Sequence, residues 1–218
     1  MPESGGSARQ VGIWAASSAA FFSIAYIVAQ LFEWAGMLGS AGGPNSASTP
    51  FGIAVLLVPS LLLGPAFVVT MAALYAVAPR ERKVFALAGL ALAIMYATLT
   101  GLVYFVQLTF VAPRLAAGDT QDIALLLFVP YKSFLFAIDL FGYSLMSAAT
   151  LFAAFGLPQA RSARAAKAAM IANGAVLPFL ALQMLVPSLI WPASAWAVTF
   201  PASAILLWRV FRELPAEG

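Results

Sequence analysis

The chain has 218 residues, of which 63% are hydrophobic and only 9% are charged. This composition lies far outside that of soluble proteins and predicts an integral membrane protein. The sequence has no cysteine and no histidine, which excludes disulfides, thiolate nucleophiles, imidazole acid–base catalysis and metal or haem sites built from those side chains. We therefore expect no cofactor and no metal site.

The formal net charge is +3, which by itself would be compatible with nucleic-acid binding. The basic residues, however, lie in short segments between long apolar runs, as loop charges of membrane proteins do. We expect membrane lipids as the surroundings of the chain and no nucleic-acid partner.

Apolar runs long enough to cross a bilayer predict an all-α, polytopic transmembrane bundle that forms a single domain over residues 1–218. The six predicted spans cover residues 11–38, 51–78, 84–111, 130–155, 168–189 and 192–208. With these spans, nearly all basic loop residues lie on the same side of the membrane, namely Arg9, Arg80, Arg82, Lys83, Arg161, Arg164, Lys167, Arg209 and Arg212. Only Arg114 lies in a loop on the opposite side. Both termini are therefore predicted to be cytoplasmic.

The first predicted span carries Gln30 and Glu33 near its far end, one helical turn apart on the same face. Glu33 either reaches the lipid headgroups or faces a polar site inside the bundle. The loop that follows, Gly39–Pro50, is small, uncharged and rich in glycine, serine and proline. It is a connector or, alternatively, a lid over an opening.

The second predicted span contains Pro59 and Pro65, which bend a helix either to shape a cavity or to fit the bundle. In the third, small residues recur every four positions, at Gly89, Ala93, Ala97 and Gly101. This spacing lets helix backbones approach closely, and we favour packing within the chain over dimerisation. Gln107 lies near the far end of the same span.

Asp139 is the most informative residue, because it is a charged side chain deep inside an apolar run. We expect residues 121–129, capped by Asp119 or Thr120, to form an interfacial or re-entrant helix and Pro130 to begin the fourth span. One helical stripe of this span then contains Lys132, Phe136, Asp139, Tyr143, Ser147 and Thr150. Lys132 lies near the interface, where it can also simply extend toward the headgroups.

The predicted fifth span contains Asn173, Pro178 and Gln183, and Trp191 with Pro192 marks a short hairpin before the last span. This six-span topology brings polar residues of several spans to the outer half of the bundle, with Asp139 deeper in the membrane. The candidate ligand-binding residues are Asp139, Lys132, Glu33, Gln107, Tyr143 and Gln183. They form one polar pocket or, alternatively, each satisfies its own helix end or a neighbouring carbonyl.

The end of the chain, an apolar run through FPAS to a WRVFRE terminus, resembles uncharacterised six-span bacterial membrane proteins over the last two spans. The resemblance implies a bacterial cytoplasmic membrane as the location. It implies no activity and no site residue.

Three function classes fit these patterns. The first is a protein that binds a lipid-like or other amphipathic small molecule in an outward-facing pocket within the membrane. The second is a small transporter that uses Asp139 as a proton or cation site, and the third is an assembly subunit that meets a membrane-complex partner or a second copy of itself. We do not expect an enzyme, because no phosphate-binding loop, helical metal pair or catalytic triad is present in the sequence.

Overall fold

A computed structural model describes residues 4–215 and is helical throughout its regular structure, with no strand among the described residues. Five helical segments are long and apolar enough to cross a membrane, as the composition predicts for a multi-pass membrane protein. These segments are Ser7–Trp34, Pro50–Val77, Arg80–Ala117, Phe134–Gly156 and Pro187–Glu213.

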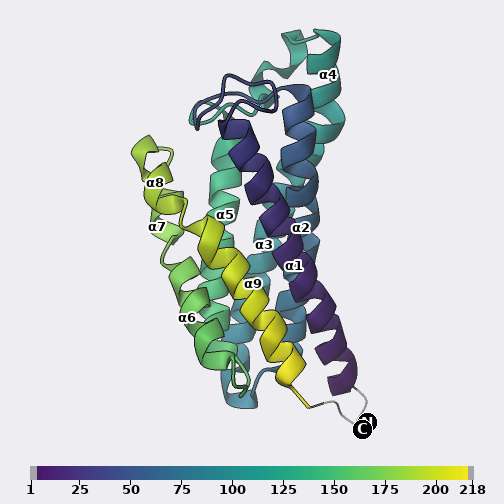
Figure 1. Cartoon of the computed structure of the whole chain (residues 1–218), viewed down its shortest axis with the longest axis vertical. Helices are drawn as coiled ribbons and strands as arrows, with labels where there is room; N and C mark the ends of the chain where they lie inside the picture. The colour runs from purple at the N-terminus through teal and green to yellow at the C-terminus, as the bar shows by residue number, and fades with distance from the viewer. Residues whose placement is uncertain (1–3, 216–218) are drawn as a thin grey trace.

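The long helices run side by side along the bundle (Figure 1). Each packs against the next in the chain, so that together they form a ring. In order around the ring they are α1 (Ser4–Trp34), α2 (Pro50–Val77), α3 (Lys83–Val106), α5 (Phe134–Ala153), α6 (Ala163–Gly174) and α9 (Trp196–Glu213). The ring closes where α9 returns to pack against α1. Side chains that point inward from all six helices therefore share one interior.

The first turns of α1 and the last turn of α9 meet at the lower end of the bundle in Figure 1. Arg9 Nε donates a hydrogen bond to the Leu214 carbonyl at 3.0 Å. The ring of Phe211 also lies directly over Gly12, where a Cβ atom would collide with it. We call this the terminal end of the bundle; the described chain begins and finishes there.

Several helix bounds differ from those predicted. The first helix stops at Trp34, and the loop that follows turns at Gly36, Gly39, Gly42 and Gly43, which all have positive φ. The third helix, predicted to end at 111, passes through a π-helical turn at Gln107–Val111 into α4 (Ala112–Ala117). The predicted interfacial helix is a short 3-10 helix, Gln121–Leu126, and the Thr120 side chain does not cap it.

The fourth helix begins later than predicted, at Phe134 rather than Pro130. Ser133 is its N-cap, and its Oγ accepts a hydrogen bond from the Phe136 N–H at 3.2 Å. Serine is a strong N-cap because it satisfies an N–H group that has no partner within the helix. Pro130 instead lies in the turn that leads into the cap.

The predicted fifth span, 168–189, is not a continuous helix. It is divided into α6 and the short α7 (Leu177–Ala181), and it is not among the five segments of spanning length. The break follows from sequence, because Gly174 is a poor helix former and Pro178 lacks an N–H group and disfavours helix before it. The predicted last span, 192–208, lies within a longer segment that includes α8 (Ile190–Ala193) and α9.

Near the terminal end, α3 and α5 approach each other through small residues. A Cβ atom on Gly89 would lie 2.8 Å from Ala153 Cβ and 2.9 Å from the Ala149 carbonyl oxygen, and Gly156 is equally close to Ala86. Such contacts replace the hydrophobic effect as the force between helices in lipid. We call the part of the bundle packed in this way the closed half.

The predicted small-residue stripe on α3 is divided between two neighbours. Gly89 packs against α5, Ala97 lies against Gly64 of α2, and a Cβ on Gly101 would meet nothing within 4 Å. A repeat of four residues on a helix of 3.6 residues per turn rotates by about 40° at each step, so the stripe turns gradually away from one partner. The packing within the chain that we favoured is present at Gly89 and Ala97.

Candidate functional site

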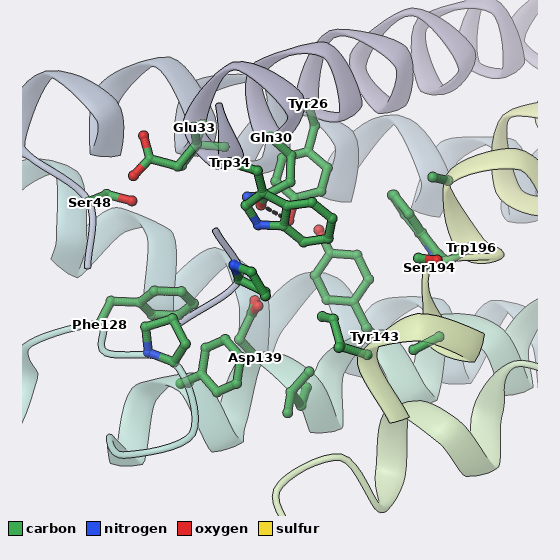
Figure 2. A pocket seen from close by; sticks show the side chains of 18 of the residues that line it. Tyr26, Gln30, Glu33, Trp34, Ser48, Phe128, Asp139, Tyr143, Ser194 and Trp196 are labelled. Atoms are coloured by element: carbon green, nitrogen blue, oxygen red, sulfur yellow. Dashed lines mark hydrogen bonds between the residues drawn. The ribbon is translucent and has the colours of Figure 1, made fainter. Parts of the chain in front are cut away.

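A cavity of about 400 Å³ lies inside the ring at the end opposite the terminal end. Its walls come from the last turns of α1, the first turns of α2, the first half of α5 and the start of α9. Figure 2 shows α1 and α5 on opposite sides, with Glu33 and Gln30 projecting from one and Asp139 and Tyr143 from the other. The cavity thus occupies the half of the bundle that small residues do not close.

Aromatic rings form the floor of the cavity, toward the closed half. The ring of Tyr143 lies edge-on to Trp196 at 5.1 Å between centroids and stacks against Tyr26 at 6.4 Å. Behind them, Phe200 stacks on Trp196 at 5.3 Å and Tyr96 packs edge-on to Tyr143 at 5.8 Å. We call Tyr26, Tyr143 and Trp196 the aromatic floor. Their large side chains fill the space between the helices at this level of the bundle.

Tyrosine hydroxyls line this floor and connect to polar side chains. The Tyr26 hydroxyl donates to Gln30 Oε1 at 3.1 Å, and the hydroxyls of Tyr104 and Tyr143 are hydrogen-bonded at 3.2 Å. The Tyr104 hydroxyl also lies near the Asp139 carboxyl. Asp139 is therefore next to this group of hydroxyls.

Three side chains in the cavity keep buried acceptor atoms without a partner. Asp139 is 7% exposed, Glu33 3% and Gln183 1%. Asp139 Oδ1, both carboxylate oxygens of Glu33 and Gln183 Oε1 have no hydrogen-bond partner among the described residues. Among the described residues that line the cavity, none is a lysine or arginine. A buried carboxylate without a partner is costly, which makes this arrangement unusual for a purely structural interior.

The Glu33 carboxylate lies beside the first turn of α2, since a Cβ on Gly52 would be 2.9 Å from Oε2. The positive end of the helix dipole favours an anion at this place. The Gly52 N–H itself is taken by Thr49 Oγ1, the N-cap of α2, at 3.1 Å. The Glu33 oxygens therefore lie beside this helix end without a hydrogen-bond partner among the described residues.

Four of the six predicted site residues line this cavity, namely Asp139, Glu33, Tyr143 and Gln183. Lys132 is exposed and does not line it, and it precedes the Ser133 cap instead of lying within the helix as predicted. Gln107 is buried outside the cavity, and its Nε2 donates to the Leu126 carbonyl at 2.6 Å. Ser147 and Thr150, lower on the predicted Asp139 stripe, also lie outside the cavity.

The predicted connector Gly39–Pro50 lies against the cavity, which residues Gly43, Pro44, Ser46 and Ser48 help to line. It is tied to the ends of the helices that it joins. The Gly43 N–H donates to the Trp34 carbonyl at 2.9 Å, and Thr49 Oγ1 donates to the Leu38 carbonyl at 2.7 Å. The loop therefore forms part of the wall of the cavity.

Sequence reasoning missed Tyr131, which lines the cavity with a backbone φ of 60°. Its hydroxyl accepts a hydrogen bond from Gln183 Nε2 at 3.1 Å, linking the turn before α5 to the segment after α7. Burial raises the pKa of the Tyr131 hydroxyl above its ordinary value, although the hydrogen bond from Gln183 acts in the opposite direction. Positive φ at a non-glycine residue is a strained conformation of the kind that gathers at functional sites, and no signal in the sequence announces it.

No family model, curated protein or solved structure matches this chain. The function therefore has to be argued from the cavity and from the bundle that holds it.

Proposed function

We propose that the protein binds a lipid-like or other amphipathic small molecule in the cavity between α1, α2, α5 and α9. The observation that carries this proposal is the cavity of about 400 Å³, with mainly apolar and aromatic walls and a few buried polar groups that converge on it. This is the usual construction of a small-molecule site. A closed bundle would have favoured an assembly subunit, whereas a cavity that reaches Asp139 favours binding or transport.

The proposed topology has six crossings with both termini in the cytoplasm. The described chain begins and finishes at the same end, which requires an even number of crossings. Five helical segments have spanning length, so the sixth crossing falls to the broken segment of α6 and α7. The basic loops gather at the terminal end, which supports a cytoplasmic terminal end, a cavity that opens outward, and a bacterial cytoplasmic membrane as the location.

The loop Gly39–Pro50 is proposed as the lid of this site. It lies over the cavity and contains several glycines with positive φ, which can change conformation at little steric cost. Displacing it would open a path from the outer aqueous phase to Asp139 without moving any long helix.

A transporter is the second candidate, and the broken fifth segment favours it. Discontinuous helices at the substrate site are typical of secondary transporters, and Leu180 of α7 and Gln183 just beyond it line the cavity. This segment would have to move for the cavity to open toward the terminal end of the bundle. Uptake of a radiolabelled alkylamine into proteoliposomes, lost in Asp139→Asn, would establish transport over simple binding.

Photo-crosslinking in lipid nanodiscs tests the proposed site. Diazirine-bearing dodecanol and dodecylamine are added to the full chain, and labelled residues are located by peptide mass spectrometry. We expect labelling at cavity residues such as Leu57 and Tyr143 that an excess of the unmodified compound abolishes.

A matched pair of variants on α9 provides the control. Ala197→Phe places a ring in the cavity that Ala197 lines, whereas Val198→Phe adds the same ring at a neighbouring position that is 72% exposed and does not line it. Competable labelling should be lost in the first and kept in the second. Labelling confined to lipid-facing residues such as Phe21, and equal in both variants, would contradict the proposal.

A further inference from the structure

We infer that the ligand of this cavity carries a protonated amine head group. The inference rests on the proposed function, since it concerns the same cavity, and it adds the chemistry of the ligand. The unpartnered atoms of Glu33, Asp139 and Gln183 are all hydrogen-bond acceptors, and two of the three groups are carboxylates. A ligand that forms hydrogen bonds with these acceptor atoms and balances the carboxylates has to supply N–H or O–H donors and positive charge.

The charge balance of the cavity supports a cation. Glu33 and Asp139 are the acidic residues that line it, and none of the described lining residues is basic. An anionic head group would add to this negative charge at a place where Coulomb interactions are strong because little water surrounds them. A cation would neutralise it, and buried carboxylates of this kind are normally paired.

The aromatic residues support the same conclusion. Trp34 and Trp196 line the cavity together with Tyr26, Tyr131 and Tyr143. The faces of such rings attract ammonium groups, most strongly where water is excluded. Aromatic rings and two carboxylates that line one cavity are a combination suited to binding an organic cation.

The hydrogen-bonding pattern selects an amine with N–H groups over a quaternary ammonium. A protonated primary amine donates three hydrogen bonds, which suits acceptors presented from separate segments of the chain. A trimethylammonium group has the same charge and the same attraction to aromatic faces but no donor. It would leave Gln183 Oε1 and the carboxylate oxygens without partners, and such unmade bonds are costly when buried.

The apolar part of the ligand has its own surface in the cavity. Ile53, Leu56 and Leu57 of α2 line one side, and Leu140 of α5 and Leu180 of α7 line another. An alkyl chain that contacts these side chains places its head group among the polar residues. A short amine without a chain would lack this contribution and bind weakly.

A head-group series with one chain length tests the inference. Dodecylamine, dodecyltrimethylammonium, dodecanol and dodecyl sulfate, with ethylamine as the chain-free amine, compete against the photoreactive dodecanol in nanodiscs. We expect dodecylamine to compete about tenfold better than dodecanol or dodecyl sulfate, with the trimethylammonium compound in between and ethylamine inactive. Equal competition by all dodecyl compounds would leave the amphiphile site intact and overturn the amine inference.

Variants assign the preference to named side chains. In Asp139→Asn and in Glu33→Gln, the ratio of dodecylamine to dodecanol affinity should fall by about tenfold, because the shape of the cavity is kept and only charge is removed. The ratio is measured within each variant, so a small change in folding does not affect it. An unchanged ratio in both variants overturns the inference, and failure of every dodecyl compound to compete overturns the proposed site together with it.

Discussion

The two halves of the bundle differ in whether their buried polar side chains have hydrogen-bond partners. In the closed half, Asn173 of α6 donates to Thr150 of α5 and accepts from Thr199 of α9, each at 2.9 Å, so that one amide joins three helices. In the cavity half, both buried carboxylates that lack a partner among the described residues line the cavity. Ser147 Oγ also lacks a partner among the described residues and lies outside the cavity, so it is the unpaired carboxylates, rather than unpaired polar atoms in general, that distinguish the cavity half and indicate a ligand.

The same contrast holds for packing. Glycines bring α3 and α5 into backbone contact in the closed half, at Gly89 and Gly156. Toward the other end, Gly142 still accommodates Thr100, and near it the two helices are joined by the hydrogen-bonded hydroxyls of Tyr104 and Tyr143. The change from small to aromatic residues along one helix pair is what opens the interior above the aromatic floor.

The largest effect is expected where the closed half is tightest. In Gly89→Leu the new side chain would collide with the backbone of α5 and force the helices apart, which should lower the free energy of unfolding by about 3 kcal/mol. The matched control on the same helix is Gly101→Leu, where a Cβ meets nothing within 4 Å. Thermal unfolding in detergent measures both, and equal melting temperatures would show that α3 and α5 do not pack as described.

A smaller effect is expected for the polar link of the closed half. Asn173→Leu removes the bonds to Thr150 and Thr199 and should cost about 1.5 kcal/mol, since hydrogen bonds between helices in membranes contribute modestly. Thr199→Val removes one of the two bonds and should cost about half as much. A stabilised Asn173→Leu protein would mean that this amide, like those in the cavity, serves something other than the fold.

The smallest effect on folding is expected in the cavity, at Asp139. Asp139→Asn keeps the shape and should change stability by less than about 0.5 kcal/mol, whereas Asp139→Leu should cost about 1 kcal/mol because it places an apolar side chain against the nearby Tyr104 hydroxyl. Thermal unfolding of the two proteins without added amphiphile gives this comparison. A loss of stability in Asp139→Asn as large as that in Gly89→Leu would make the carboxylate a structural group.

The sequence predicted the features that depend on composition and on helical spacing. Charge in an apolar run identified Asp139, and helical spacing from it identified Tyr143, both of which line the cavity. The threading of spans brought Glu33 and Gln183 to the same end as Asp139, and they line it as well. These predictions needed only the length of the spans and the side of each polar residue.

Local hydrogen bonding decided what the sequence did not predict. The sequence predicts a helix that begins at Pro130 and includes Lys132, whereas the helix begins after the Ser133 cap and Lys132 lies outside it. Gln107 lies at the expected end but its amide bonds to the Leu126 carbonyl, a contact between distant segments. Tyr131 and Trp196 enter the cavity through a strained turn and through the closure of the ring by α9, and neither is encoded in a short pattern.

The most direct test of the account is whether water reaches Asp139 from the outer side. The native chain has no cysteine, so Asp139→Cys introduces a single thiol. A membrane-impermeant, water-soluble thiol reagent added outside intact cells should label this thiol, as it labels the exposed loop variant Asn45→Cys. It should not label Ser147→Cys, two turns further along α5, where the serine is fully buried below the cavity. Complete protection of Asp139→Cys, with Asn45→Cys reacting, would contradict the outward-facing cavity and with it the proposed binding site.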